Sequence, residues 1–256
     1  MRTLAPIFAI LTLLASPVHA QERALKFGTE GAYPPFNNLT ADGKLVGFDI
    51  DIGNALCAEL KATCEWVVQD WDGMIPALQA GKFDAAVASM FITEERKTQV
   101  DFTQPYYRTP AAFLALKTSP LSGVSAGDLD GKTIGVQGSS VYANYVETLL
   151  PASKLKAYGA IEDMFADLAS GRVDAVNDDL IVLQNFLASP EGSCCKLIGT
   201  VASVPEIHGE GAGIAVRKGD PLRGELDAAI TAIRASGKFK EINDKYFDVD
   251  LSPNPG

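Results

Sequence analysis

A pattern that occurs twice constrains the fold of this chain more than any other sequence feature. It begins at Met74 and again at Met164, and both copies have the form Met-x3-Leu-x2-Gly-Lys/Arg-x-Asp-Ala. In each copy, apolar residues four positions apart indicate a helix, the glycine ends that helix, and the Asp-Ala run begins a strand. Two similar segments, 27–31 and 134–138, precede the copies and are typical of strand ends.

The order strand, helix, strand, helix predicts parallel sheets with right-handed crossovers, and two such units predict two α/β lobes. We expect the chain to cross between the lobes near 107–110 and near 209–213. Lobe 1 then comprises 21–108 and 212–256, and lobe 2 comprises 109–211. Small ligands bind at the carboxyl ends of the strands in such folds, so the cleft between the lobes is the expected binding site.

The first twenty residues are typical of a secretory signal. Arg2 is followed by an apolar run over 4–14, and the segment closes on Val18-His19-Ala20. A membrane anchor needs about 20 apolar residues, which is more than this run provides. We therefore predict a signal peptide over 1–20, cleaved after Ala20, and a mature exported protein without membrane insertion.

Charge and composition exclude several classes of protein. The chain has 32 acidic and 22 basic residues and a net charge of −10, which argues against nucleic acid as a partner because phosphate binding needs a basic surface. Its 47% hydrophobic and 21% charged residues suit a globular protein. The two histidines, His19 and His208, have no partner at metal-ligand spacing. We expect no metal site, no cofactor and no Ser-His-Asp hydrolase.

The four cysteines form two pairs in the sequence. In one continuous helix, Cys57 and Cys64 would lie about 10 Å apart, beyond the roughly 7 Å that a disulfide spans. If they pair, the helix must end near Leu60; we favour this disulfide because the chain is predicted to be exported. Cys194 and Cys195 are adjacent, and we interpret them as free or occasionally oxidised thiols because a disulfide between neighbours is strained.

Three segments are expected to face the cleft. The first, 30–36, presents the acid Glu30 and the ring of Tyr33. The second, 88–96, contains Thr93, a good helix N-cap, which places Arg96 on the first helical turn beside free backbone N–H groups. This combination suits a carboxylate, although Arg96 is equally explained as a surface residue paired with a neighbouring acid, Glu95 or Asp101.

The third segment, 135–140, is a Gly/Ser-rich turn that enters a helix and can donate backbone N–H groups to an anion. Asp178 and Asp179 end the strand of the second copy, and one of them is a candidate partner for an ammonium group. Trp71 precedes a helix and is a candidate pocket wall. One arginine, several amides, two acids and two aromatic rings fit an amino acid whose side chain is cationic or flat.

The sequence resembles the polar-amino-acid solute-binding proteins of ABC importers, particularly the histidine-binding and lysine–arginine–ornithine-binding subgroup. The likeness covers essentially the whole mature chain and implies the type II periplasmic binding protein fold, an α/β fold with two Rossmann-like lobes joined by two hinge strands. The stretches that carry the likeness are Gly47-Phe48-Asp49-Ile50-Asp51, Ile92-Thr93-Glu94-Glu95-Arg96, Val100-Asp101-Phe102-Thr103, Pro105-Tyr106-Tyr107, Gly131 to Ser140, Gly171 to Ala175, and Lys245-Tyr246-Phe247-Asp248.

The resemblance also implies roles for individual residues. Arg96 and the amides of Ser89 and Ser140 would hold the α-carboxylate, and Asp179 would accept the α-ammonium. The side chain would lie between two aromatic rings, with Glu30 at its distal charge. The family's paired cysteines match Cys57 and Cys64. The full predicted ligand-binding set is Glu30, Tyr33, Trp71, Ala88, Ser89, Phe91, Arg96, Ser139, Ser140 and Asp179.

One departure affects the choice of ligand. Basic-amino-acid binders commonly have serines where this chain has Ala88 and Phe91, so a modified or smaller cationic compound is a further possibility. The leading hypothesis is a periplasmic monomer that captures arginine, lysine, ornithine, histidine or a related guanidino or opine compound and delivers it to a membrane ABC permease. The alternative is a periplasmic enzyme on the same scaffold, a dehydratase of the cyclohexadienyl or arogenate type, with Glu30 or Asp178 as its acid or base.

Overall fold

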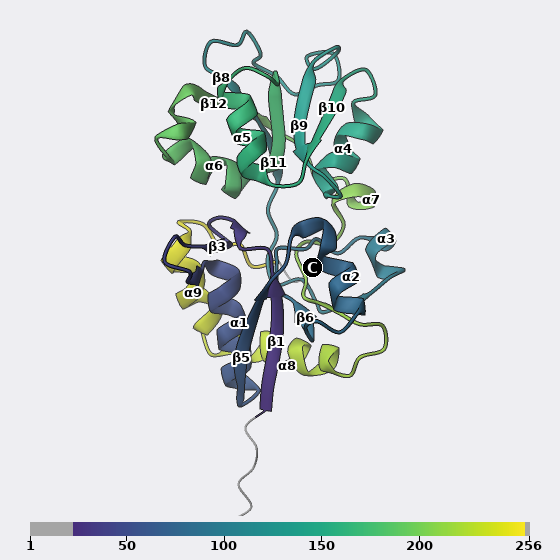
Figure 1. Cartoon of the computed structure of the whole chain (residues 1–256), viewed down its shortest axis with the longest axis vertical. Coiled ribbons are helices and arrows are strands. Elements are labelled where there is room, and N and C mark those ends of the chain that lie inside the picture. The colour runs from purple at the N-terminus through teal and green to yellow at the C-terminus, as the bar shows by residue number, and fades with distance from the viewer. Residues whose placement is uncertain (1–22, 254–256) are drawn as a thin grey trace, which may run out of the picture.

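The computed structural model of the chain describes residues 23–253, so the signal peptide predicted for 1–20 lies outside the described residues. Two α/β lobes lie one above the other along the long axis of the molecule (Figure 1). Each lobe is built on its own five-stranded sheet. The predicted two-lobed α/β fold is therefore confirmed.

Lobe 1 is built on the sheet with strand order β5-β1-β6-β13-β7. Strands β1 (Arg23–Thr29), β5 (Ala62–Val68) and β6 (Ala85–Ala86) are parallel. Strand β13 (Ala215–Val216) runs antiparallel to β6 and to β7 (Asp101–Phe102). The chain thus returns to lobe 1 near its C-terminus to complete the sheet.

Further elements of lobe 1 surround this sheet. Helix α1 (Phe48–Glu59) packs against β5 and against α8 (Leu222–Ala235) and α9 (Lys238–Tyr246). A small antiparallel sheet β2-β3-β4 precedes α1. The remaining elements are β2 (Ala32–Tyr33), β3 (Asn37–Leu39), β4 (Leu45–Val46), the 3-10 turn η1 (Trp71–Gly73), α2 (Met74–Gln79) and α3 (Glu94–Lys97).

Lobe 2 is built on the sheet with strand order β10-β9-β11-β8-β12. Strands β9 (Thr133–Gln137), β10 (Lys154–Tyr158) and β11 (Ala175–Asp179) are parallel, and β8 (Ala111–Leu116) is antiparallel to β11 and to β12 (Cys195–Thr200). The other elements of this lobe are α4 (Val141–Leu149), α5 (Ile161–Ala169), α6 (Leu180–Ala188), the 3-10 turn η2 (Glu191–Cys194) and α7 (Pro205–His208).

The repeated sequence pattern forms the same unit in both lobes. Its first copy is α2 followed by β6, and its second is α5 followed by β11. Gly81 and Gly171 lie just beyond the two helices with φ angles of 73° and 72°, a left-handed conformation that glycine adopts without strain. The prediction of parallel sheets was only partly right. Strand β8 runs antiparallel to β11 and β12, and β13 runs antiparallel to β6 and β7, because the chain enters β8 and β13 from the interlobe segments and not through a crossover helix.

The two sheets are connected by 103–110 and 201–214. These segments meet beside lobe 1, where Ala212 pairs with Phe91 and with Tyr107 in isolated bridges. Buried rings surround this point: Phe36 stacks on Tyr107 with 4.6 Å between ring centroids, and the ring centroids of Phe48 and Phe247 are 5.1 Å apart. The aromatic cluster fixes the interlobe segments to the loop that carries the first predicted site residues.

The disulfide between Cys57 and Cys64 is present and joins α1 to β5, with its Cα atoms 5.8 Å apart. Helix α1 ends before Leu60, as the spacing requires, and Lys61 turns the chain with a φ of 51°.

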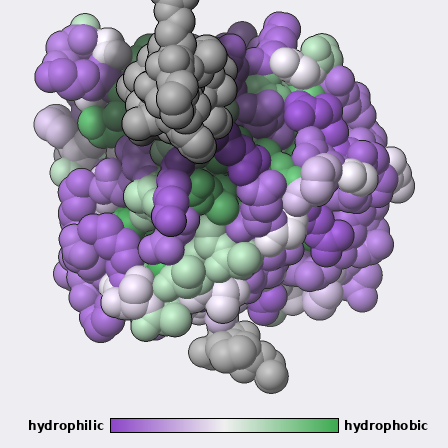
Figure 2. Space-filling view, turned by 90° about the horizontal axis from the view of Figure 1, so that it is seen from below, coloured by the Kyte–Doolittle hydropathy of each residue, from purple (hydrophilic) through white to green (hydrophobic). Residues whose placement is uncertain are grey.

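No helix of residues 23–253 is long and apolar enough to cross a membrane. Viewed from the lobe 1 end, the surface is mostly hydrophilic with smaller hydrophobic areas (Figure 2), which fits a net charge of −10.

Candidate ligand-binding cleft

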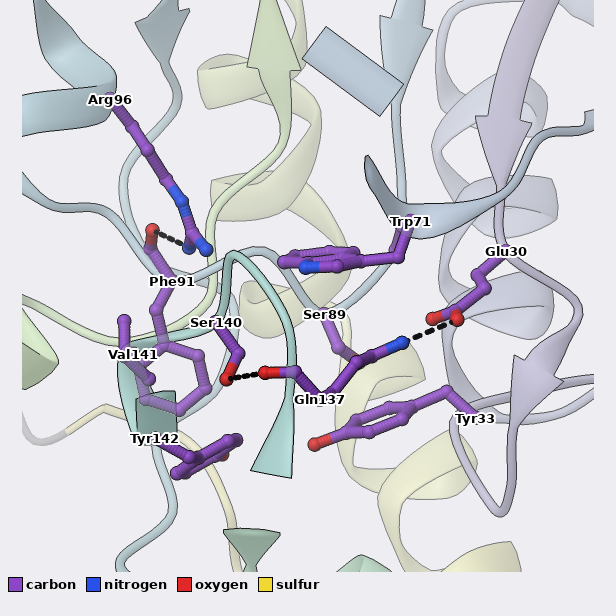
Figure 3. A pocket seen from close by; sticks show the side chains of 11 residues that line it. Glu30, Tyr33, Trp71, Ser89, Phe91, Arg96, Gln137, Ser140, Val141 and Tyr142 are labelled. Carbon is purple, nitrogen blue, oxygen red and sulfur yellow. Dashed lines mark hydrogen bonds between the residues drawn. The ribbon is translucent and has the colours of Figure 1, made fainter. Parts of the chain in front are cut away.

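A small cavity lies where the two lobes meet, with a volume of about 20 Å³. A volume of this size holds about one water molecule. Lobe 1 and lobe 2 both contribute side chains, and these point toward one another across the cleft (Figure 3). The lining residues are Glu30, Tyr33, Trp71, Ala88, Ser89, Phe91 and Arg96 from lobe 1, and Gln137, Ser140, Val141 and Tyr142 from lobe 2.

Arg96 is held in the cleft by the start of helix α3. Thr93 is the N-cap of this helix, as predicted, and its hydroxyl accepts a hydrogen bond from the Arg96 backbone N–H at 3.2 Å. The guanidinium donates to the Phe91 carbonyl oxygen at 2.8 Å and, across the cleft, to the Ser139 carbonyl oxygen at 3.0 Å. It also lies over the Trp71 ring, 5.1 Å from the ring centroid.

The charge of Arg96 has no carboxylate partner within residues 23–253. Only 8% of the residue is exposed, and no salt bridge to Glu95, Asp101 or another described acid forms. Burial lowers the pKa of Arg96 to about 10, so the guanidinium is still protonated at neutral pH. The surface interpretation of Arg96 is therefore wrong, and a buried, unpaired guanidinium is a strong site for a carboxylate.

The two amides predicted beside Arg96 differ in the structure. The Ser89 backbone N–H donates to the Tyr106 hydroxyl at 3.1 Å and is thus already bonded. Ser140 is the N-cap of α4: its hydroxyl accepts from the Ala143 N–H at 3.1 Å and donates to the Gln137 carbonyl oxygen at 2.7 Å. The first N–H groups of a helix have no intrahelical acceptor, so the start of α4 remains a suitable anion contact.

Glu30 lies at the other end of the cleft, directly after β1. Its Oε1 accepts a hydrogen bond from the Gln137 side-chain amide at 2.6 Å. Figure 3 shows this amide reaching from lobe 2 toward Glu30, with Tyr33 and Trp71 on either side in that view. Glu30 is 7% exposed, and burial raises its pKa to about 8 despite the hydrogen bond from Gln137.

Two further acids lie behind the cavity wall. The Tyr33 hydroxyl donates to Asp178 Oδ1 at 2.6 Å, and Asp178 Oδ2 is buried with no hydrogen-bond partner in the described chain. Asp179 caps α6 by accepting from the Ile181 N–H at 2.8 Å, and it also accepts from the Thr109 hydroxyl. Burial raises the pKa of Asp178 to about 7 and that of Asp179 to about 6.

Eight of the ten predicted ligand-binding residues line the cavity, and Ser139 and Asp179 do not. Asp179 stands back because its carboxylate caps a helix and meets an interlobe hydroxyl. Ser139 has a φ of 53° and presents its backbone carbonyl oxygen to Arg96. The direct ligand contacts of all ten residues stay predictions.

Sequence reasoning missed three lining residues, Gln137, Val141 and Tyr142. A signal for Gln137 was present, because Glu30 and Gln137 hold the same position in the two similar strand-end segments. Tyr142 had no such signal: it enters the cavity from the first turn of α4, and its ring centroid lies 6.4 Å from that of Phe91.

The sequence profile of the bacterial extracellular solute-binding proteins, family 3, matches residues 25–249. The chain belongs to this family. The L-arginine-binding protein of Pseudomonas aeruginosa is 45% identical over 256 residues, which covers 98% of each chain. The resemblance seen in the sequence is thereby confirmed.

Solved structures give the same result. A Salmonella typhimurium periplasmic binding protein of high arginine specificity has a TM-score of 0.80 and 36% identity, covering 88% of this chain and 99% of that chain. An ancestral amino-acid-binding protein, described as a precursor of cyclohexadienyl dehydratase, has a TM-score of 0.79 and 31% identity, covering 88% and 96% of the two chains. The fold is therefore shared by binding proteins and by a precursor of an enzyme.

Proposed function

We infer that this family member binds a cationic amino acid, arginine foremost, in the periplasm and passes it to an ABC permease. The observation that carries this inference is the pairing of two buried groups at opposite ends of one cleft. Arg96 is a cation without a carboxylate partner in the described structure, and the side chain of Glu30 accepts its hydrogen bond from a neutral amide, that of Gln137. A ligand with a carboxylate at one end and a cation at the other complements both.

A cationic side chain suits this cleft better than a neutral one. A guanidinium that takes the place of the Gln137 amide supplies Glu30 with a full positive charge and more than one N–H donor. The rings of Tyr33 and Trp71 offer flat faces to such a planar group. A neutral side chain gives Glu30 no counter-charge, so Glu30 stays protonated below its raised pKa of about 8 and the ligand gains no ion pair there. The names of several relatives support a cationic ligand, because these relatives are arginine-binding proteins.

The α-ammonium of the ligand needs an acceptor near Arg96. We assign it to the Asp178–Asp179 pair. Asp178 has a buried oxygen with no partner in the described chain, and its other oxygen is held by Tyr33, which lines the cavity. Phe91 and Tyr142 narrow this part of the cleft, so a ligand with a bulky substituent on the α-nitrogen should bind more weakly than a free amino acid.

Binding requires the lobes to separate, because a cavity of about 20 Å³ is too small for an amino acid. Within residues 23–253, three side-chain hydrogen bonds join the lobes across the cleft: Gln137 to Glu30, Tyr33 to Asp178, and Arg96 to the Ser139 carbonyl oxygen. We place the hinge in the connecting segments 103–110 and 201–214. Closure around the ligand then presents one rigid surface to the permease.

A panel of ligands in a thermal-shift experiment tests the proposal. Saturating ligand stabilises the folded protein according to its affinity, so arginine should give the largest rise in melting temperature, with lysine, ornithine and histidine next. Glutamine and leucine should give little. A rise with glutamine or leucine but none with the cationic amino acids would reject the charge argument.

An enzyme on the same fold is the second candidate. The raised pKa of Glu30 suits a general acid at neutral pH, and one structural neighbour is a precursor of a dehydratase. Incubation with prephenate or arogenate decides between the two. Product formation that Glu30→Gln abolishes would establish the enzyme, whereas arginine binding without turnover supports transport.

A further inference from the structure

The cysteines at 194 and 195 have no part in the cleft, and their sulfur atoms lie against each other. Cys194 ends the turn η2 and Cys195 begins β12. The two Sγ atoms are 3.0 Å apart, and neither cysteine is in a disulfide. The backbone here is well anchored, because the Cys194 carbonyl oxygen accepts a hydrogen bond from the Lys117 N–H at 2.8 Å.

We propose that Cys194 and Cys195 are a redox-modification site, which exchanges with an external disulfide to form a reversible disulfide between the two neighbours. The pair sits at one edge of the lobe 2 sheet, at the end of β12 that pairs with Leu116, whereas the other end of β12 pairs with Ala112 beside the interlobe segment. The site is thus distinct from the ligand-binding cleft.

The two sulfurs differ in access, which sets the order of reaction. Cys194 is partly exposed, whereas Cys195 is 2% exposed and packs in the core of the lobe. An external disulfide can reach only Cys194. The Cys194 thiolate attacks one sulfur of that disulfide, forms a mixed disulfide and releases the first thiol.

Cys195 then resolves the mixed disulfide from within. It loses its proton to solvent, attacks Cys194 Sγ at the short distance already present, and expels the second thiol. In total, the two cysteines lose two protons and two electrons, and the external disulfide is reduced to two thiols. Burial raises the pKa of Cys195 to about 12, so this second step should become faster as the pH rises.

Reversibility follows from the covalent spacing. Neighbouring Cα atoms are about 3.8 Å apart, which is shorter than the roughly 4.4–6.8 Å of ordinary disulfides. A disulfide under such strain is more easily reduced than an ordinary structural one, such as that between Cys57 and Cys64. A mild reductant should therefore open the Cys194–Cys195 bond first.

The experiment treats the purified mature protein with oxidised glutathione and maps its cysteines by mass spectrometry. The wild-type peptide carrying both cysteines should lose two hydrogens, and this change should reverse with dithiothreitol before the Cys57–Cys64 bond opens. Cys195→Ser should instead retain glutathione on Cys194. Cys194→Ser should leave Cys195 as a free thiol, because an external disulfide does not reach it.

Three results would overturn the proposal: two free thiols in the treated wild type, a lasting glutathione adduct on its Cys194, or a dimer linked through Cys194. The wild-type measurement decides the matter even where a variant folds poorly. The outcome is also independent of the ligand proposal, since no step uses the cleft. Circular dichroism and an intact Cys57–Cys64 bond serve as the checks that each variant is folded.

Discussion

Arg96 and Glu30 show how burial gives an ordinary charged side chain a binding role. Each is almost fully removed from water, and the side chain of each is hydrogen-bonded to neutral groups: two backbone carbonyl oxygens for Arg96 and one amide for Glu30. The pKa of Arg96 is lowered and that of Glu30 is raised, as burial without a counter-charge requires. A ligand carboxylate beside Arg96 and a ligand cation beside Glu30 therefore each offset the free-energy cost of burying these charges.

Arg96→Ala should reduce arginine affinity by a factor of roughly 10²–10³ or more. Removing one partner of a buried ion pair costs about 3–5 kcal/mol, because the ligand carboxylate then lies unpaired in the cleft. Arg96→Lys should recover only part of the affinity, since an ammonium lacks the two-pronged geometry. Titration calorimetry measures both. Arg223→Ala, which breaks an exposed pair with Asp227, is the control and should bind as the wild type does.

Gln137→Ala should raise arginine affinity about fivefold. The Gln137 amide competes with the ligand guanidinium for Glu30, and one hydrogen bond contributes about 1 kcal/mol. Gln79→Ala removes a comparable amide on the surface and should change nothing. Calorimetry measures whether arginine affinity rises or falls: weaker binding in Gln137→Ala would mean that Gln137 contacts the ligand and does not compete with it.

At the scale of elements, the sequence was most informative where a local pattern determines the structure. The helix–glycine–strand copies, the Thr93 cap and the end of α1 before Cys64 all depend on neighbours in the chain. The antiparallel direction of β8 and β13 was not predicted, because it depends on how the chain enters and leaves a lobe. Tyr142 was missed because the orientation of α4 over the cleft is a tertiary property.

Replacing both Cys57 and Cys64 by serine should lower the free energy of unfolding by about 2–3 kcal/mol, the chain-entropy value for a short closed loop. Arginine affinity should stay the same, because this disulfide joins α1 to β5 and neither cysteine lines the cavity. Urea titration measures the first quantity and calorimetry the second. The Cys194→Ser/Cys195→Ser double variant, which keeps the Cys57–Cys64 bond and is assayed without reductant, is a matched control. A large loss of affinity in the Cys57/Cys64 variant alone would show that α1 positions the site.

For the molecule as a whole, closure of the lobes is coupled to the binding of protons by buried acids. Glu30, Asp178 and Asp179 are buried where the lobes meet, and burial raises their pKa values to about 8, 7 and 6. Each acid therefore binds a proton in the closed arrangement at a pH where it is ionised in water. The stabilisation is complete below the ordinary pKa, 4.5 for Glu30, and is lost as the pH rises through the folded pKa. Closure without ligand should thus weaken from about pH 5 to about pH 8.

The Glu30→Gln variant measures how much Glu30 contributes to the pH dependence of closure. The glutamine imitates the protonated acid at every pH, so the melting temperatures of wild type and variant, without ligand, should agree below about pH 4.5. They should diverge progressively from about pH 5 to about pH 8, with the variant the more stable, and the difference should stay constant above that. Groups common to both proteins, such as the buried His208, cancel in the comparison.

Bound arginine reverses this order of stability between wild type and Glu30→Gln, because its guanidinium stabilises ionised Glu30. Wild-type affinity should then rise from about pH 6 to about pH 8, with proton release on binding, and Glu30→Gln should bind weakly at all pH values. Calorimetry in two buffers of different ionisation enthalpy counts the protons. The exposed Glu59→Gln is the control, and equal pH slopes in wild type and Glu30→Gln would show that Glu30 is not the group that couples closure to protons.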